Sequence, residues 1–289
     1  MLTLNVKDLS TPDLHNYLQH AIAPRPICFA STIDGGGRVN LSPFSFFNMF
    51  SSNPPVCVFS PSRRTRDNTT KHTLQNIYEV PEVVINMVNY AMVQQTSLAS
   101  VEYPKGVNEF IKAGLTQLPS QLIKPPRVAE APIQLECVVN DVIALGGKGG
   151  AGNLVMAEIK LIHISESILN ENRTIDQLKT DFVARMGGDW YCRANKDNMF
   201  KVPKPNTEIG MGIDALPHHI RNSKILTGNN LGQLGNLAGL PDGASVKAYR
   251  DKHMGKIPVL ADSLHFAAQE MLNTGNTAEA LLLLLTQEK

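Results

Sequence analysis

The sequence is poor in cysteine and tryptophan and carries almost no net charge. It holds one tryptophan and four cysteines, and its formal net charge of +1 gives no overall attraction to nucleic acid or to an anionic membrane. Cys28, Cys57, Cys137 and Cys192 form no C-x-x-C pair, which argues against a zinc site or a disulfide framework. Three of them lie in apolar, strand-like runs, where free thiols are usually buried. We therefore expect a reducing compartment, the cytoplasm.

Other signals are also missing. The residues from Met1 to Ser10 lack the basic start and apolar core of a secretory signal, and no apolar run reaches the roughly 18 residues that a membrane span needs. No G-x-S-x-G nucleophile motif occurs, and the adjacent His218 and His219 have no carboxylate at ligand spacing. We predict no membrane contact, no metal site and no catalytic side-chain constellation.

Turn signals divide the first two-thirds of the chain into many short strands. The strand over residues 25–33 ends in Asp-Gly-Gly-Gly, which is typical of a hairpin turn, and a Pro-Pro pair opens the strand after residue 54. Further strand patterns cover residues 82–88, 132–145 and 153–165. Short turns and few long helices predict a mainly β protein, an antiparallel barrel with peripheral helices.

A glycine-rich segment, GGKGGAG over residues 146–152, matches the dinucleotide-binding pattern G-x-G-x-x-G by its letters alone. That pattern requires a helix next, whose N-terminus holds the pyrophosphate. The residues that follow, NLVMAEIKLIHI, are strand-like. We therefore interpret the segment as a flexible hairpin tip and reject a Rossmann domain.

The composition changes near residue 200. A linker-like run, KVPKPN, follows, and then a loop-rich stretch and a helical tail. In the tail, Leu264, Ala268 and Leu272 recur at the spacing of one helix face. We predict a first domain over residues 1–200 and a C-terminal extension over residues 201–289, loop-rich and then helical.

The richest stretch runs from Asn40 to Thr70 and places aromatic and hydroxyl side chains one short strand before an arginine-rich loop. Guanidinium groups and hydroxyls suit a phosphate, and aromatic residues suit a flat ring. This combination favours FMN, although a solvated loop and core phenylalanines are the plainer alternatives. Consecutive strand residues point to opposite faces, so Phe46 and Phe47 cannot both face a ligand.

A second candidate surface is the segment RMGGDWY, from Arg185 to Tyr191. Its paired glycines let the backbone approach a ligand closely, and its aromatic residues beside an arginine could wall a planar ring. The alternative is a hydrophobic anchor after a glycine turn.

At these residues the sequence resembles the flavin reductase-like family with the FMN-binding split barrel. The similar branch includes the reductase component of nitrilotriacetate monooxygenase and flavoredoxin. The resemblance runs from Ile22 to Tyr191, about 60% of the chain, and its pieces occur in the family's order. They are APRP, NLSPFSFFNMFSSNPP, SPSRRTRDN, VINMV, PPRVAEAPIQLEC and RMGGDWY.

The resemblance implies an antiparallel split β-barrel, a homodimer, and FMN near the subunit interface. It implies that the ring and the ribityl chain lie against one group of residues, namely Ser45, Phe46, Phe47, Asn48 and the nearby Ser51. It implies that the phosphate lies within a second group, namely Ser60, Arg63, Arg64, Asp67, Asn68 and Thr69. It also implies that the turn holding Arg185, Gly188 and Tyr191 approaches the ring.

One departure concerns the phosphate group of residues. Relatives often carry a basic residue, Asp and Thr in a row, whereas this chain reads Arg66-Asp67-Asn68-Thr69. An amide therefore replaces a hydroxyl at Asn68, which leaves its role as a donor open.

The function that follows is an FMN-binding oxidoreductase in which NAD(P)H, the co-substrate, gives hydride to the flavin. The alternative is an FMN-binding electron-transfer or carrier protein without nicotinamide chemistry. A separate monooxygenase or another acceptor is the expected partner. Nucleic-acid binding is a weaker alternative because the positive charge is confined to one loop.

Overall fold

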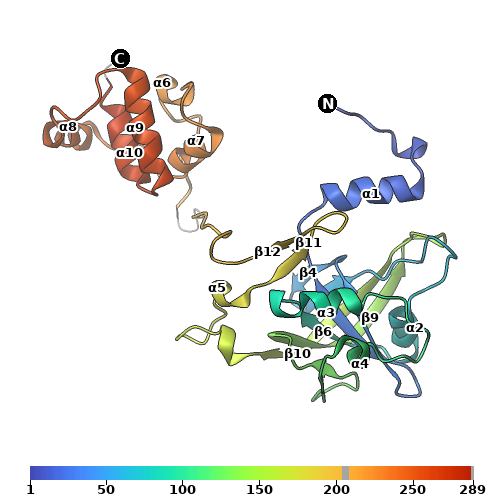
Figure 1. Cartoon of the computed structure of the whole chain (residues 1–289). Coiled ribbons are helices and arrows are strands. Elements are labelled where there is room, and N and C mark those ends of the chain that lie inside the picture. The colour runs from blue at the N-terminus through green and yellow to red at the C-terminus, as the bar shows by residue number, and fades with distance from the viewer. Residues whose placement is uncertain (204–207, 288–289) are drawn as a thin grey trace. The chain divides into compact units, whose positions relative to one another are not determined.

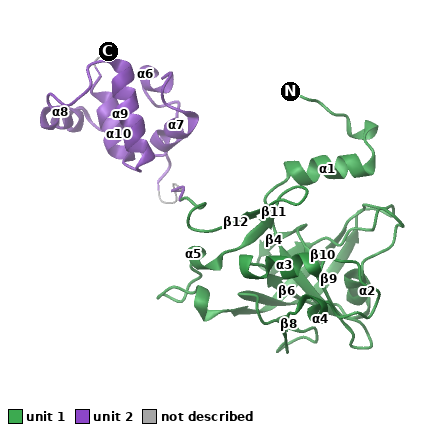
Figure 2. Cartoon of the chain, in the orientation of Figure 1, with its two compact units in different colours: residues 1–200 green, residues 201–289 purple. Residues whose placement is uncertain are grey.

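The structure is a computed structural model that describes residues 1–203 and 208–287. The chain forms two compact units, Met1–Phe200 and Lys201–Lys289 (Figure 2). Each unit has its own hydrophobic core. Among the described residues, no helix combines the length and the apolar character needed to cross a bilayer.

The first unit is built on a seven-stranded sheet in which every neighbouring pair is antiparallel (Figure 1). The spatial order is β3-β2-β6-β9-β10-β5-β4. The strands are β2 (Cys28–Ile33), β3 (Val39–Phe44), β4 (Phe47–Ser52), β5 (Pro55–Phe59), β6 (Glu82–Met87), β9 (Ile133–Ala144) and β10 (Asn153–Ile164).

The two edges of this sheet lie close together. Only Ser45 and Phe46 separate edge strand β3 from edge strand β4, and three Cα–Cα steps span at most about 11 Å. In a flat sheet seven strands wide, the edges would lie roughly 29 Å apart. The sheet therefore curls into a barrel that is split between β3 and β4, which confirms the predicted antiparallel split barrel.

The barrel interior contains three of the four cysteines, Cys28, Cys57 and Cys137, as buried free thiols among Phe59 and other apolar side chains. Burial raises the pKa of the Cys28 thiol well above its ordinary value. Because all three are packed among apolar side chains, these thiols act as small hydrophobic side chains.

The spacing of Leu74, Ile77 and Tyr78 predicts that all three are buried on one face of a helix. Helix α2 (His72–Glu79) buries Leu74 and Ile77 against the barrel, but the prediction is wrong for Tyr78, whose side chain is 65% exposed. One residue beyond Ile77 is a rotation of about 100° around the helix, which carries Tyr78 to the outer face.

The long hairpin of β9 and β10 has two irregularities in register, between Met156 and Ala157 and between Ile159 and Leu161. The first leaves Asn140 of β9 without a partner in the ladder, and the second leaves Lys160 of β10 without one. The extra residue in β10 reverses the faces of the strand beyond it, which explains why the sequence of β10 does not alternate cleanly between polar and apolar residues. The glycine-rich segment is the tip of this hairpin, as predicted, and connects Ala144 to Asn153.

A second, three-stranded sheet joins distant parts of the chain, since its central strand pairs with a strand that precedes the barrel. Short helices complete the unit, and Ser10 caps the first of them through a hydrogen bond from Asp13 N. These elements are α1 (Thr11–Ala21), α3 (Val93–Leu98), α4 (Glu109–Ala113), α5 (Gln177–Thr180), β1 (Arg25–Pro26), β11 (Val183–Arg185), β12 (Tyr191–Arg193), and the paired β7 (Gln117–Leu118) and β8 (Arg127–Val128).

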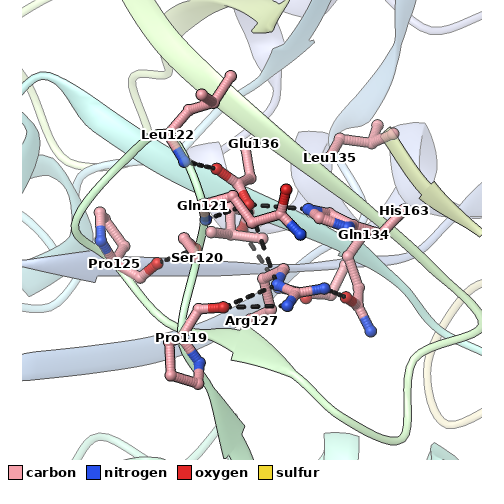
Figure 3. Close-up of polar contacts among 12 residues, drawn as sticks. Pro119, Ser120, Gln121, Leu122, Pro125, Arg127, Gln134, Leu135, Glu136 and His163 are labelled. Atoms are coloured by element: carbon pink, nitrogen blue, oxygen red, sulfur yellow. Dashed lines mark hydrogen bonds and ion pairs between the residues drawn. The ribbon is translucent and has the colours of Figure 1, made fainter. Parts of the chain in front are cut away.

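A buried carboxylate fixes the irregular segment between β7 and β9 to the barrel (Figure 3). Glu136 accepts hydrogen bonds from Gln121 N at 2.8 Å and Leu122 N at 2.7 Å, and its carboxylate lies 2.8 Å from Nε2 of His163. Arg127 lies beside it, 3.9 Å away. Burial alone would raise the pKa of Glu136, but the two amides and His163 outweigh it and lower the pKa. His163 is thus a hydrogen-bonded structural residue.

The second unit is helical, which confirms the partly helical extension. Leu264, Ala268 and Leu272 form the buried face of α9, as their spacing predicted. The helices are α6 (His218–Arg221), α7 (Gly228–Gly235), α8 (Gly243–Lys252), α9 (Ala261–Asn273) and α10 (Thr277–Leu285).

Candidate functional site

A cavity of about 290 Å³ opens at the split in the barrel. Five of the residues predicted to contact a ligand line it, although they come from three separate parts of the chain. They are Ser45, Phe46, Ser60, Arg185 and Tyr191. It lies beside the β3–β4 connection, where the two edge strands do not pair with each other.

The β3–β4 connection presents one of its two phenylalanines to this cavity. The Phe46 ring is 42% exposed, and its centroid lies 6.2 Å from that of His15 and 6.0 Å from Cζ of Arg25. Phe47 points the other way and packs against the barrel core. This is the opposite orientation that the two-residue repeat of a strand requires.

Two other residues predicted for the ring, Asn48 and Ser51, lie on β4 outside the cavity. The Asn48 side chain is exposed and accepts a hydrogen bond from Met49 N at 2.8 Å. Ser51 is partly buried and pairs with Val56 of β5. The structure therefore brings Ser45 and Phe46 to the cavity, but not Phe47, Asn48 or Ser51.

Many polar groups of the arginine loop, residues 60–70, form hydrogen bonds with other residues of the same loop. Arg63 donates from Nε to Asn68 Oδ1 at 2.8 Å and from Nη2 to Asn68 O at 2.6 Å. Asn68 adopts a left-handed backbone with φ of 57°, which asparagine tolerates better than most residues. Its amide nitrogen donates to Gly147 O at 3.0 Å. Asn68 thus fastens the loop and does not line the cavity.

Arg64 is likewise engaged by its surroundings. It donates to Glu102 Oε1 at 3.0 Å, to Thr69 Oγ1 at 3.0 Å and to Thr70 O at 2.7 Å. The Thr69 hydroxyl and amide donate to Asp67, and these bonds lower the pKa of Asp67 to about 2. Asp67 and Thr69 therefore shape the loop from outside the cavity.

The glycine-rich hairpin tip packs against the arginine loop and is hydrogen-bonded to it. Arg63 N donates to Ala151 O at 2.8 Å, and Gly150 N donates to Arg63 O at 2.9 Å. A Cβ on Gly149 would lie 2.9 Å from Cα of Thr65, closer than side chains approach a backbone. The tip needs glycine for this contact, and the two backbone bonds hold it against the loop. Sequence reasoning identified a hairpin tip but missed this contact.

Lys71 is the functional candidate that sequence reasoning missed most clearly. It lines the cavity at the start of α2, partly buried, with its ammonium 5.5 Å from the centroid of Phe44. Burial and then the neighbouring Arg64 lower its pKa. Within residues 1–203 and 208–287, no hydrogen bond or ion pair engages its amine. The available signal was a basic residue directly before a helix that begins His72-Thr73.

A second cavity, of about 540 Å³, adjoins the first. The two share His15, Ser62 and Lys71 as a common wall. Arg63 and Arg64 line the second cavity rather than the first. The two arginines predicted to bind a phosphate therefore lie beyond the shared wall, whose cation is Lys71.

The turn between β11 and β12 closes the first cavity from the other side. Arg185 donates to Tyr191 Oη and to Gly188 O at 2.6 Å, with its guanidinium 4.7 Å from the centroid of the Tyr191 ring. Gly188, with φ of 57°, serves as this acceptor and does not line the cavity. The Trp190 side chain is 77% exposed, so it is not a buried anchor.

Arg25 holds α1 against that turn. It donates to Gln19 O at 2.5 Å and Ile22 O at 2.6 Å near the end of α1, and to Met186 O at 2.6 Å. These bonds satisfy carbonyls that the helix end leaves free. Arg25 is buried and lines the cavity, and its Nε has no partner among the described residues.

The site suits a flat ligand with an anionic tail. One end offers an exposed aromatic face at Phe46, and the junction offers the unpaired Lys71. The Ser60 hydroxyl accepts a hydrogen bond from Asn153 N at 3.1 Å, so its own proton remains available for donation. No cluster of three or more metal-ligating side chains occurs among the residues that the structure describes.

A protein-family comparison matches residues 20–179 to the flavin reductase like domain. That span is more than half of the chain. The chain belongs to the flavin reductase-like family. The assignment supports a flavin-linked oxidoreductase, which agrees with the cavity at the split.

Individual relatives agree with this assignment. A protein of Aquifex aeolicus is 35% identical over 197 residues, covering 68% of this chain and 98% of its own length. The solved structure of nitrilotriacetate monooxygenase component B from Bacillus cereus is 27% identical, covers 70% of this chain and 98% of its own, and has a TM-score of 0.65. The 2-nitrobenzoate 2-nitroreductase of Pseudomonas fluorescens is 25% identical, covers 70% and 96%, and has a TM-score of 0.62. Each of these matches covers about 70% of the chain.

Proposed function

We propose that this flavin reductase-like protein binds FMN at the split in the barrel and uses NAD(P)H to reduce it. The observation that carries the proposal is the cavity that joins the aromatic wall at Phe46 to the unpaired cation of Lys71. This arrangement matches a ring with a phosphate tail in both shape and charge.

The residues divide into two roles. Ser45, Phe46 and Tyr191 contact the ring, since they form the wall on the barrel and β12 sides of the cavity. Lys71 and the Ser60 hydroxyl bind the phosphate, with Arg63 and Arg64 contributing charge from the second cavity. Asn68, Asp67 and Thr69 hold the arginine loop in its conformation, and Gly188 holds Arg185.

Bound FMN supplies the hydride chemistry of its ring. The protein then needs to bind and orient the ring and to limit access of water to it. Arg185 fulfils part of this role, because its bonds to Gly188 and Tyr191 fix a positive charge at the ring end of the cavity. No side-chain acid or base is required for hydride transfer itself.

We propose a homodimer whose contact surface includes edge strand β4. Met49 and Phe50 on that strand are 65% and 71% exposed, and Phe46, the residue before the strand, is 42% exposed. Contiguous exposed apolar side chains of this kind mark association surfaces. A sedimentation measurement of a β4 variant such as Phe50→Glu tests this, and unchanged dimers would contradict it.

A separate monooxygenase is the proposed recipient of the reduced flavin, because the similar Bacillus cereus protein is a monooxygenase component. We place the reaction in the cytoplasm, where NAD(P)H is available and thiols such as Cys28 stay reduced. Cell fractionation tests the location, and recovery outside the cytoplasmic fraction would contradict it.

The function is tested by an absorbance spectrum of the FMN-loaded protein before and after anaerobic addition of NADPH or NADH. Loss of the flavin bands supports the reductase. A yellow protein that neither nucleotide bleaches would instead support a flavin carrier without nicotinamide chemistry. A colourless protein that takes up no FMN contradicts both.

A further inference from the structure

We propose that the second unit contains an acid-sensitive latch, in which His265 of α9 holds the connection between α6 and α7 in place only while its imidazole ring is neutral. The connection comprises residues 222–227. The flavin reductase like domain matches residues 20–179, and both cavities described above lie in the first unit. The latch therefore goes beyond the proposed function and does not depend on it.

The Ser223 hydroxyl is the centre of the latch. Its oxygen accepts hydrogen bonds from Ile225 N and Leu226 N, both at 3.1 Å, and it lies 2.7 Å from Nδ1 of His265. A hydroxyl oxygen has two lone pairs, and the two amide protons occupy both. The hydroxyl proton of Ser223 is therefore the one that joins the two side chains, and Nδ1 of His265 accepts it.

This direction of the hydrogen bond determines the form of the ring. Because Nδ1 accepts, the neutral imidazole of His265 carries its own proton on Nε2. Nε2 is buried and makes no hydrogen bond among the described residues, and the same is true of Oε1 of Gln287. The His265 side chain is only 6% exposed, so bulk water does not supply a partner either. The ring is thus held by a single hydrogen bond that requires its neutral form.

A second proton on the ring conflicts with this arrangement. A protonated imidazole donates from both nitrogens, so Nδ1 would have to donate to an oxygen whose lone pairs the two amides already use. Either one amide of the connection or the ring itself then loses its partner, and a buried charge without a partner is costly. Protonation of His265 therefore weakens the link between α9 and the connection.

The charges around the ring give the direction of the pH dependence. Burial, and then His219 of α6, lowers the pKa of His265 from the ordinary 6.5. Asp262 of α9 and the amide of Gln287 act in the opposite direction. Lys224 in the connection is exposed, and α7 carries no charged residue. Because the folded-state pKa is lowered, the stability that the neutral ring contributes is present above 6.5 and is lost as pH falls through the folded-state pKa.

The effect of acid is local, because other contacts still hold the connection and α9. Gln269, one turn after His265 on α9, donates to Ile225 O at 3.0 Å and to Asn230 Oδ1 at 3.1 Å. Neither bond involves a group that titrates near neutral pH. The buried apolar face of α9 is also independent of pH. Acid should therefore loosen the connection while the rest of the second unit stays folded.

The test measures backbone amide hydrogen exchange of the full-length protein by mass spectrometry, at about pH 7.5 and about pH 5.5. Rates are corrected for the intrinsic effect of pH on exchange. We expect the protection of peptides that cover the connection to fall by up to about tenfold per pH unit below 6.5, the effect of binding one proton. Strand β6 of the first unit is the internal reference and should keep its protection.

Two variants assign the response to one histidine. His265→Asn retains an amide oxygen that can accept from Ser223 but does not titrate, so the protection of the connection should no longer depend on pH. The matched control is His253→Asn, which alters another imidazole of the second unit, stacked on Tyr249 with ring centroids 4.4 Å apart. This control should respond to acid as the unmodified protein does.

Three results would overturn the inference: protection of the connection that does not change with pH in the unmodified protein, an acid response that His265→Asn retains, or one that His253→Asn loses. If His265→Asn does not fold, His219→Asn decides the question. Removing the repelling imidazole of His219 raises the folded-state pKa of His265 toward 6.5, so the acid response should become smaller. An unchanged response in His219→Asn would contradict the latch.

Discussion

The amine of Lys71 provides the sharpest test of how the site holds a phosphate. The substitution Lys71→Met keeps the length of the stem and removes the charge. Because no hydrogen bond or ion pair among the described residues engages the ammonium, the substitution removes only its contact with the Phe44 ring inside the protein. The fold should therefore tolerate the change, and its effect should appear in ligand binding.

The magnitude follows from the interaction that the substitution removes. A hydrogen bond between charged groups contributes about 1.5–3 kcal/mol, and each 1.4 kcal/mol is a factor of about ten in affinity. We expect FMN to bind Lys71→Met about 10- to 100-fold more weakly than the unmodified protein. Riboflavin lacks the phosphate, so its affinity should change by less than about twofold.

Fluorescence titration of both flavins measures this ratio, with Lys105→Met as the control. Lys105 is also on the first unit but pairs with Glu79 and lines neither of the two cavities. Equal losses for FMN and riboflavin would refute the reasoning, since they would show that Lys71 acts on the ring or on the fold.

The same lysine predicts a pH dependence. Burial lowers its pKa from the ordinary 10.5, so the free protein loses this cation at a lower pH than an exposed lysine would. FMN affinity relative to riboflavin should fall as pH rises, starting below 10.5. Because phosphate binds the charged amine, FMN binding should also take up protons in that range. A ratio that stays flat to pH 10.5 in the unmodified protein would contradict this.

Three further predictions follow from the loop and the barrel. The double variant Arg63→Ala, Arg64→Ala should weaken FMN far more than riboflavin, and equal losses by titration would remove the loop from the phosphate site. Gly149→Ala should displace the arginine loop and lower FMN affinity by about tenfold, whereas Gly147→Ala, with no atom near its Cβ, should not; matching affinities would contradict the contact. Glu136→Gln should lower the free energy of unfolding, measured in urea, by about 2–4 kcal/mol. Since the folded-state pKa of Glu136 is lowered, its contribution to stability is present above the unfolded-state pKa and is lost as pH falls through the folded-state pKa. A variant as stable as the parent at neutral pH would refute this prediction.

The sheet was largely predictable because local signals determine it. Glycine and proline turns fix where strands end, and strand formers fill the segments between them. The strand order was not readable from these signals. It depends on side chains of distant segments, as in the pairing of β2 with β6, which local patterns do not record.

The ring end of the site was predicted partly by the two-residue repeat of strands. That repeat predicts that the side chains of Phe46 and Phe47 point to opposite faces. It does not predict which of them lines the cavity, because that depends on the curvature of the sheet. The failure at Asn48 and Ser51 has the same origin, because the direction in which β4 leaves the connection is set by its pairing with β5.

The phosphate end illustrates a different limit. Counting arginines in the loop located the right segment, but it could not show which side chains form hydrogen bonds within the loop. Asn68 and Thr69 engage Arg63 and Arg64. Lys71, which seemed an ordinary residue before a helix, lines the cavity with an amine that no hydrogen bond or ion pair among the described residues engages. Hydrogen-bond partners across a loop depend on its three-dimensional conformation, which the order of residues does not reveal.

The most direct measurement is a crystal structure of the protein with FMN. We predict the ring against Phe46 in the split of the barrel and the phosphate within hydrogen-bond distance of the Lys71 amine. A flavin bound elsewhere, or a split cavity without flavin in crystals that hold FMN, would contradict this prediction.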